Sequence, residues 1–233
     1  MKKIMDILDM LKGIHIAGGA TALITGVLAM ATKKGHVNHR LFGKIFFWSM
    51  ALTCLLGLNA GIFRSGYLLF IPIALISFYQ VATGYRILYI KKLHEGQKPL
   101  LVDWALTIGM LITTMAFIIW AINSLQTDAF LSIVLFAFST IGMYCCAVDL
   151  FHYIKKPIEK NYWLFIHIFR MSHGFIAALT AFLVNNSRLF KFLPQVLLLI
   201  IPISIGQPII TYVIWTYRRK KTKADLLIAE ARI

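Results

Sequence analysis

The chain has 233 residues, of which 59% are hydrophobic and 14% are charged, and its mean hydropathy is +0.77. A soluble domain has about 45–50% apolar and about 25% charged residues, so this composition excludes an ordinary soluble domain and indicates an integral membrane protein. A net charge of +15 would suit a nucleic-acid partner, but the charges fall in short clusters between long apolar runs. Such clusters are typical of the loops that orient a membrane protein. We therefore expect a lipid bilayer as the environment and no nucleic acid.

The first residues predict a helix that lies in the membrane interface. Ile4, Ile7, Leu8 and Leu11 follow the i, i+3, i+4, i+7 spacing of one apolar helix face. Two aspartates and a lysine interrupt the apolar stretch, which argues against a signal peptide. Residues 1–13 are therefore expected to form a short amphipathic interfacial helix.

Seven later segments are long and apolar enough to cross a bilayer, because a spanning helix needs about 20 mainly apolar residues. The sequence therefore predicts an all-α integral membrane protein, a seven-transmembrane-helix bundle in a single domain. A tight hairpin at 64–66 joins the second and third spans, and residues 218–233 form a basic tail. The seven predicted spans are 14–32, 44–63, 67–90, 104–124, 128–154, 163–184 and 192–217.

The distribution of Lys and Arg predicts the orientation. With these spans, 17 basic residues fall on the side that carries the C-terminal tail and 6 fall on the other side. Loops rich in Lys and Arg stay in the cytoplasm. We expect the N-terminus outside and the C-terminus in the cytoplasm, which an odd number of spans requires.

The first span places a histidine above a narrow face of small residues. His15, Gly19, Ala22, Gly26 and Ala29 are spaced by four and three residues in turn. A histidine beside small residues can bind a haem iron while the small residues make room for the porphyrin. The same pattern also serves close helix packing, with His15 at the outer water boundary. Both interpretations are open at this point.

The sixth span carries His167, Arg170 and His173, whose side chains fall within a 120° arc of one helix. A guanidinium at membrane depth requires an anionic partner or several carbonyl groups. This set predicts a functional interior site. The alternative is a structural network in which Arg170 holds neighbouring helices together.

Near the predicted cytoplasmic boundary, Asp149 and His152 form an i, i+3 pair. Together with His36, His39 or His94 they would suit Zn²⁺ or a proton relay. This zinc hypothesis is weaker, because histidines in loops are commonly solvated.

The seventh span contains two prolines and a glycine within seven residues, at Pro202, Gly206 and Pro208. Proline removes a backbone donor, so the sequence predicts a kinked or broken helix. Breaks of this kind often line binding cavities in transporters, although they also occur for packing alone.

Three stretches resemble one bacterial family: HIAGGATALITG in the first span, HRLFGKIFFWSM entering the second, and HIFRMSHGFIAALTAFLVNN through the sixth. The family consists of multi-pass membrane proteins and is called domain of unknown function 2306. The resemblance covers most of the chain, and the sixth-span motif is its most specific part. It implies a bacterial cytoplasmic (inner) membrane protein with polar positions at His15, His39, Arg40, His167 and Arg170, and it implies no particular activity.

Three functional hypotheses follow from these residues. The first is a redox protein with haem b or a quinone, in which His15, His39, His167, Arg170 and His173 are the candidate cofactor-binding residues. His15 lies near the outer face and His167 in the inner half, so they would not share an iron. His39 and His152 are the inner partners available to His167, which predicts one inner haem.

The second hypothesis is a metal-dependent hydrolase that acts on a lipid inside the membrane, with zinc held by Asp149, His152 and His167. The third is a proton-coupled transporter, or a binding protein for a small anionic ligand, built around Arg170 and the seventh span. The sequence does not decide whether the protein is an enzyme.

Overall fold

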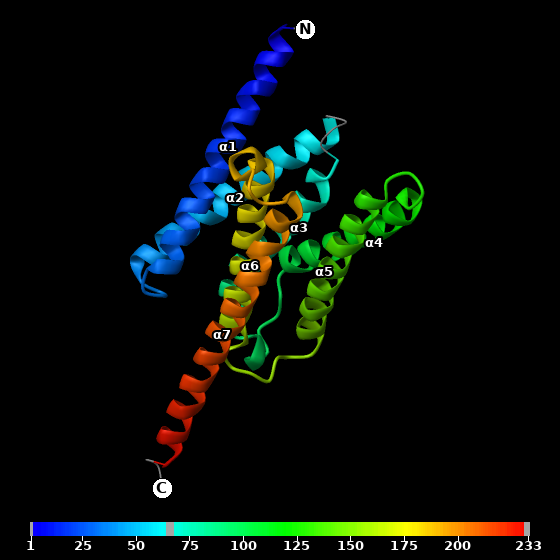
Figure 1. The fold of residues 1–233 in the computed structure, drawn as a ribbon. Helices are drawn as coiled ribbons and strands as arrows, with labels where there is room; N and C mark the ends of the chain where they lie inside the picture. Colours follow the sequence, from blue (N-terminus) through cyan, green and yellow to red (C-terminus); the bar gives the residue numbers. More distant parts are fainter. Residues whose placement is uncertain (1, 64–67, 231–233) are drawn as a thin grey trace. The chain divides into compact units, whose positions relative to one another are not determined.

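The computed structural model describes the backbone of residues 2–63 and 68–230; side chains at positions 2–6, 195 and 220–230 are not described. The predicted hairpin at 64–66 lies outside the described residues. The described part is helical throughout, with short connections (Figure 1). The α-helices are α1 Lys2–Ala31, α2 Val37–Phe63, α3 Phe70–Arg86, α4 Leu101–Ser124, α5 Ala129–Ile154, α6 Tyr162–Asn185 and α7 Gln195–Glu230. Short 3-10 turns follow α3 at Ile87–Tyr89 (η2) and Leu93–Glu95 (η3), and follow α6 at Ser187–Phe190 (η4).

Seven helices in the described residues are long and apolar enough to cross a membrane. The first of their apolar segments is Ile7–Ala31 and the last is Val196–Arg219. Each of the seven segments overlaps one of the seven predicted spans. The expected all-α class with seven spans is therefore confirmed, and the chain is a multi-pass integral membrane protein.

Two helices differ from the expectation in detail. Residues 2–13 are helical, as expected, but the helix does not end there, because α1 runs without a break from Lys2 to Ala31. Gly13 is the only helix-weakening residue near the expected boundary, and one glycine costs a helix only about 1 kcal/mol. Likewise α7 stays helical through Pro202 and Pro208 rather than breaking there.

Residues 1–178 form one compact unit, and residues 179–233, which include α7, form another. In the first unit, α1 packs against α2, and α4 packs against α5 as a second pair (Figure 1). α3 contacts α2 on one side and α4 and α5 on the other. Ten of the 17 residues of α3 are buried, so this helix forms the centre of the unit and contributes to its main apolar clusters.

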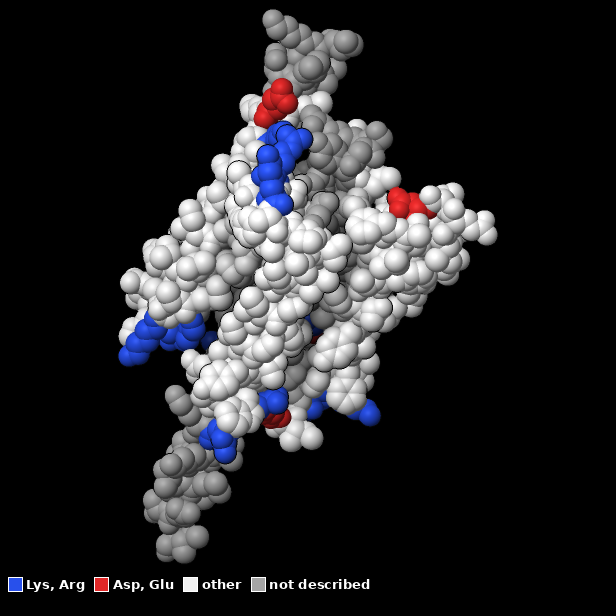
Figure 2. All heavy atoms as spheres, in the orientation of Figure 1, with Lys and Arg blue, Asp and Glu red and all other residues white. Residues whose placement is uncertain are grey.

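The outward flanks of the helices are apolar. Large hydrophobic side chains such as Trp48, Leu55, Ile112 and Ile133 are each more than 60% exposed. Figure 2 shows that the visible Lys and Arg side chains lie toward the ends of the helices. The visible flanks between these ends carry neither Lys nor Arg. Apolar flanks with charged ends are what a bilayer core and its two aqueous boundaries require.

Three connections in the first unit, at 32–36, 87–100 and 155–161, lie at the helix ends that the Lys/Arg count assigns to the cytoplasm. We call these helix ends the basic end. Arg86 and Asp103 join α3 to α4 there, with Nε–Oδ1 and Nη2–Oδ2 distances of 2.8 and 3.0 Å. Asp103 also accepts the backbone N–H of Leu100, which caps α4.

Candidate functional site

A buried polar cluster joins α3, α5 and α6. Its members are Arg170 on α6, Asp149 on α5, and Tyr79 and Gln80 on α3, each at most 5% exposed. Arg170 Nη2 donates to Asp149 Oδ1 at 2.8 Å and to the carbonyl oxygen of Cys145 at 3.0 Å. Arg170 Nη1 donates to Gln80 Oε1 at 3.2 Å. The guanidinium therefore finds both an anion and neutral acceptors inside the protein, as an arginine at membrane depth requires.

The second carboxylate oxygen of Asp149 is also occupied. Tyr79 donates its hydroxyl hydrogen to Asp149 Oδ2 at an O–O distance of 2.5 Å. The guanidinium carbon of Arg170 also lies 5.2 Å from the centre of the Tyr79 ring, within the range of a cation–π contact. Asp149 and Arg170 thus form a buried ion pair whose charges cancel, and Tyr79 contacts both members.

This geometry supports the interpretation of Arg170 as part of a network that holds helices together. Its counterion is Asp149, so the structure offers no support for Arg170 as the anion-binding group of a transporter. Asp149 was expected as a weak candidate metal ligand. In the structure, both of its carboxylate oxygens accept hydrogen bonds from other helices, one from Arg170 and one from Tyr79.

His152, the other weak metal candidate, is also engaged elsewhere. Its Nδ1 donates to the carbonyl oxygen of Val148 at 2.8 Å, and its ring stacks on Tyr162 at a centroid distance of 4.2 Å. Among the described residues, no group of three or more His, Cys, Asp or Glu side chains could hold a metal ion. The arrangement expected for a zinc hydrolase, with Asp149, His152 and His167 together, is therefore not formed.

At the basic end, the structure does bring two predicted residues together. His39, in the first turn of α2, and His167, in α6, have ring centroids 6.4 Å apart and ring planes at 77° to each other. His39 Nδ1 lies 2.9 Å from the carbonyl oxygen of Ala29, and His167 Nδ1 lies 2.8 Å from that of Gly84. Four helices, α1, α2, α3 and α6, thus set the positions of these two imidazoles. We call them the histidine pair.

The ends of α1 and α3 explain these two hydrogen bonds. The last four carbonyl groups of a helix have no partner within it, and Ala29 and Gly84 both lie in a last turn. The close approach of α6 to α3 depends on glycine, because a Cβ atom at Gly84 would lie 2.7 Å from Arg170 Cβ. Each histidine therefore also caps a helix, which stabilises the fold whether or not a cofactor binds.

The hydrogen bonds fix the protonation pattern of both rings. A carbonyl oxygen only accepts, so Nδ1 of His39 and of His167 must carry the hydrogen. In a neutral imidazole this leaves Nε2 as the atom with a free lone pair, which is the usual way in which a backbone carbonyl prepares a histidine for a metal.

The backbone of α2 is uncovered one helical turn after His39. Gly43 follows His39 by one helical turn and so lies on the same face of α2. A Cβ atom built at Gly43 would meet nothing within 4 Å. Two basic side chains lie nearby: Arg40 is adjacent to His39 in sequence and exposed, and Lys91 is close enough to His167 to interact with it electrostatically.

The other two candidate histidines lie apart from the pair. His15 Nδ1 bonds the carbonyl oxygen of Thr53 at 3.1 Å, and it is 14 residues from Ala29, or about 21 Å along α1. His173 Nδ1 bonds the carbonyl oxygen of Phe169 in its own helix at 2.8 Å, with ring centroids 4.0 Å apart.

Sequence reasoning did not join Tyr79 and Gln80, which lie in the third span, to Arg170. One signal pointed to the counterion. Apart from Asp128 at the very start of the fifth span, Asp149 is the acidic residue that falls inside the predicted spans, and a membrane arginine requires an anion.

Comparisons with protein-family models, curated proteins and solved structures found no match to this chain.

Proposed function

We propose that this protein is a membrane redox protein that holds one b-type haem between His39 and His167 at the basic end. The observation that carries the proposal is the histidine pair itself: two imidazoles from different helices, each with Nδ1 on a helix-terminal carbonyl and Nε2 left as a ligand atom. The Lys and Arg count supports a cytoplasmic position for this end.

The number of protein ligands favours haem over zinc. A protein zinc site takes three or four protein ligands, whereas the porphyrin supplies four nitrogens to its iron and leaves two axial positions. The described residues provide two histidines here and no third His, Cys, Asp or Glu with them. Two ligands are what a haem with two axial histidines needs.

The separation of the rings agrees with this ligation. Two imidazoles on opposite faces of one iron have centroids about 6 Å apart, because each metal–nitrogen bond is about 2 Å long and each ring centre lies about 1 Å beyond its nitrogen. The observed distance is 6.4 Å. Little movement of α2 against α6 would be needed.

The surrounding residues have separate tasks in this proposal. The carbonyl groups of Ala29 and Gly84 hold the rings in one tautomer and one orientation. Gly43 leaves room for the porphyrin beside α2. Arg40 and Lys91 supply positive charge for its two carboxylates. Arg170, three residues after His167, acts as a positioning residue because its buried ion pair ties α6 to α5.

A haem bound by two histidines takes up and gives back single electrons, so the activity proposed is electron transfer within the membrane. The family resemblance supports a bacterial inner membrane as the location. The partner class that suits single-electron transfer there is a lipid-soluble electron carrier such as a quinone.

The test is an optical spectrum of the protein, purified in mild detergent from cells supplied with a haem precursor, before and after dithionite. We expect a Soret band in the wild type and a sharp α-band on reduction. His39→Ala and His167→Ala should each lose this spectrum or convert it to a high-spin form.

Two histidine variants serve as matched controls. His36→Ala changes an exposed residue three positions before His39, and His173→Ala changes another α6 histidine. Both should keep the wild-type spectrum. A featureless spectrum from well-folded wild-type protein, or a spectrum that His173→Ala removes and His167→Ala does not, would contradict the proposal.

A further inference from the structure

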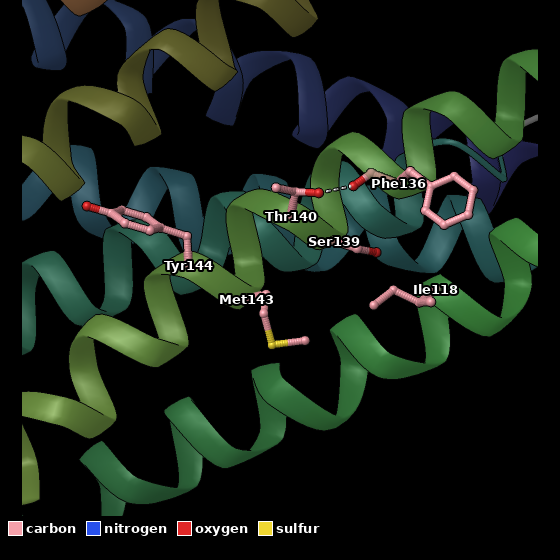
Figure 3. A pocket seen from close by; sticks show the side chains of 6 residues that line it. All are labelled: Ile118, Phe136, Ser139, Thr140, Met143 and Tyr144. Atoms are coloured by element: carbon pink, nitrogen blue, oxygen red, sulfur yellow. Dashed lines mark hydrogen bonds between the residues drawn. The ribbon is translucent and has the colours of Figure 1, made fainter.

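We infer that a crevice between α4 and α5 binds the ring of a lipid-soluble quinone, which accepts a hydrogen bond from Ser139. The crevice has a volume of about 270 Å³ and is lined by six residues, labelled in Figure 3: Ile118, Phe136, Ser139, Thr140, Met143 and Tyr144. The inference goes beyond the haem proposal and does not depend on it, because none of these residues belongs to the histidine pair.

Ser139 is the residue that points to a ligand. Its side chain is 2% exposed, and its Oγ has no hydrogen-bond partner among the described residues. A serine in an apolar helix normally donates to the carbonyl group three or four residues earlier, as Thr140 does to Phe136 at 2.9 Å (Figure 3). A buried hydroxyl without a partner lowers stability, so its presence at the wall of a crevice requires an explanation.

The chemistry of the crevice restricts the ligand to an uncharged one. Its walls carry no Lys, Arg, Asp or Glu, and Ile118, Phe136 and Met143 make most of its surface apolar. A free hydroxyl donor suits a ligand with a carbonyl oxygen. An apolar site whose donors are the hydroxyl groups of Ser139 and Tyr144 therefore selects a neutral ring that carries a carbonyl group.

The depth of Ser139 selects among neutral lipids. It lies 10 residues after the start of α5 at Ala129 and 15 before its end at Ile154, so it is about 15 and 22 Å from the two helix ends. The hydrocarbon core of a bilayer is about 30 Å thick, which places this hydroxyl near its middle. The ester carbonyls of phospholipids lie at the two surfaces of the core. A quinone ring has no charge and can reach the middle.

The volume agrees with a ring rather than a whole lipid. Small-molecule sites usually have volumes of about 300–1,000 Å³, so the crevice lies just below the small end of this range. It accommodates a substituted ring, while the isoprenoid chain would extend along the apolar flank of α5, where Ile133 is exposed.

The experiment uses the full chain in nanodiscs made from one phosphatidylcholine and loaded with decyl-ubiquinone over a range of concentrations. Quinone retained per protein is measured after gel filtration, with empty nanodiscs subtracted. We expect saturable binding near one quinone per chain. Ser139→Ala should weaken it about five- to tenfold, the usual effect of one lost hydrogen bond in an apolar site.

A pair of neighbouring isoleucines supplies the matched control. Ile118→Trp should fill the crevice and abolish saturable binding, whereas Ile119→Trp changes an exposed residue outside the crevice and should leave it intact. Ser139→Ala should also keep or raise the thermal unfolding midpoint of quinone-free protein, because it removes an unpartnered buried hydroxyl.

Three results would overturn the inference: no quinone binding beyond that of empty nanodiscs, equal binding by the Ile118→Trp and Ile119→Trp variants, or stoichiometric retention of phospholipid at this crevice in place of quinone. The haem spectrum of the same samples is measured in parallel. If quinone does not bind but the haem spectrum is intact, only the quinone site is rejected. If quinone binds but the haem spectrum is absent, only the haem proposal is rejected.

Discussion

Arg170 Nη2 and Asp149 Oδ1 lie 2.8 Å apart in the interior of the first unit, where Arg170 is 1% and Asp149 5% exposed. The two residues come from α6 and α5, and each is costly at membrane depth without the other. Gln80 and Tyr79, both on α3, complete the hydrogen bonds of the pair. Three helices therefore depend on one buried ion pair for part of their relative placement.

Removal of Arg170 alone should therefore be far more damaging than removal of the pair. Arg170→Ala leaves a buried carboxylate without its cation, and the expected loss is about 3–5 kcal/mol of unfolding free energy. The double variant Arg170→Ala/Asp149→Asn removes both charges and should recover much of this loss. Unfolding of detergent-solubilised protein, followed by circular dichroism, measures both.

Arg188→Ala is the control for the loss of one arginine, because Arg188 is exposed in the turn after α6. It should shift the unfolding free energy by less than about 0.5 kcal/mol. If Arg170→Ala and Arg188→Ala were equally stable, the buried pair would not hold these helices together.

Gly84→Ala should destabilise the protein, whereas the same change at Gly109 should not. A Cβ atom at Gly84 would lie 2.7 Å from Arg170 Cβ and 3.2 Å from the backbone nitrogen of Met171, so α3 and α6 would have to separate. The expected cost is about 1–3 kcal/mol. Gly109→Ala meets nothing within 4 Å and should gain up to about 1 kcal/mol from better helix propensity. The unfolding midpoints of the two variants, measured side by side, test whether α3 and α6 approach each other this closely. A Gly84→Ala midpoint at or above that of Gly109→Ala would contradict the close approach.

Gly43→Leu should separate haem binding from folding. Because the space beside Gly43 is open, a leucine there should leave the unfolding midpoint within about 3 °C of the wild type. It would occupy the volume that the haem proposal assigns to the porphyrin, so the haem content per protein should fall by at least tenfold. Haem is measured by the pyridine haemochrome spectrum. A Gly43→Leu protein with full haem content would show that the porphyrin does not lie beside α2.

The angle between the two imidazole planes predicts a magnetic signature. The planes of His39 and His167 are 77° apart. Each axial imidazole changes the energy of one iron d orbital. When the two ring planes are nearly perpendicular, two different orbitals are changed by almost the same amount, so they stay almost equal in energy and the low-spin ferric signal is highly anisotropic. The electron paramagnetic resonance spectrum of oxidised protein should therefore show one large g-value, without the rhombic pattern of parallel rings. A rhombic spectrum would mean that the rings rotate when haem binds or that other residues are the ligands.

The sequence by itself determined the class of the fold and the number of spans. Seven apolar segments at 14–217 became seven helices that each overlap the predicted span, because hydrophobic length is a local property and a bilayer requires each crossing segment to satisfy its own backbone hydrogen bonds. The same local reasoning identified His39, His167 and Arg170 as candidates, because polar side chains stand out in apolar surroundings. It also predicted a kinked or broken seventh helix, and α7 remains helical through Pro202 and Pro208.

Only the tertiary structure decided which of these residues belong together. From sequence, Asp149 was grouped with His152 and His167 as a metal site, and packing instead placed it against Arg170 and Tyr79. The partners of His39 and His167 are backbone carbonyls of other helices, which no side-chain pattern encodes. Periodicity specifies the direction of a side chain about its own helix axis. The rotation and depth of neighbouring helices depend on close contacts such as that of Gly84 with α6, and these arise only when the helices pack.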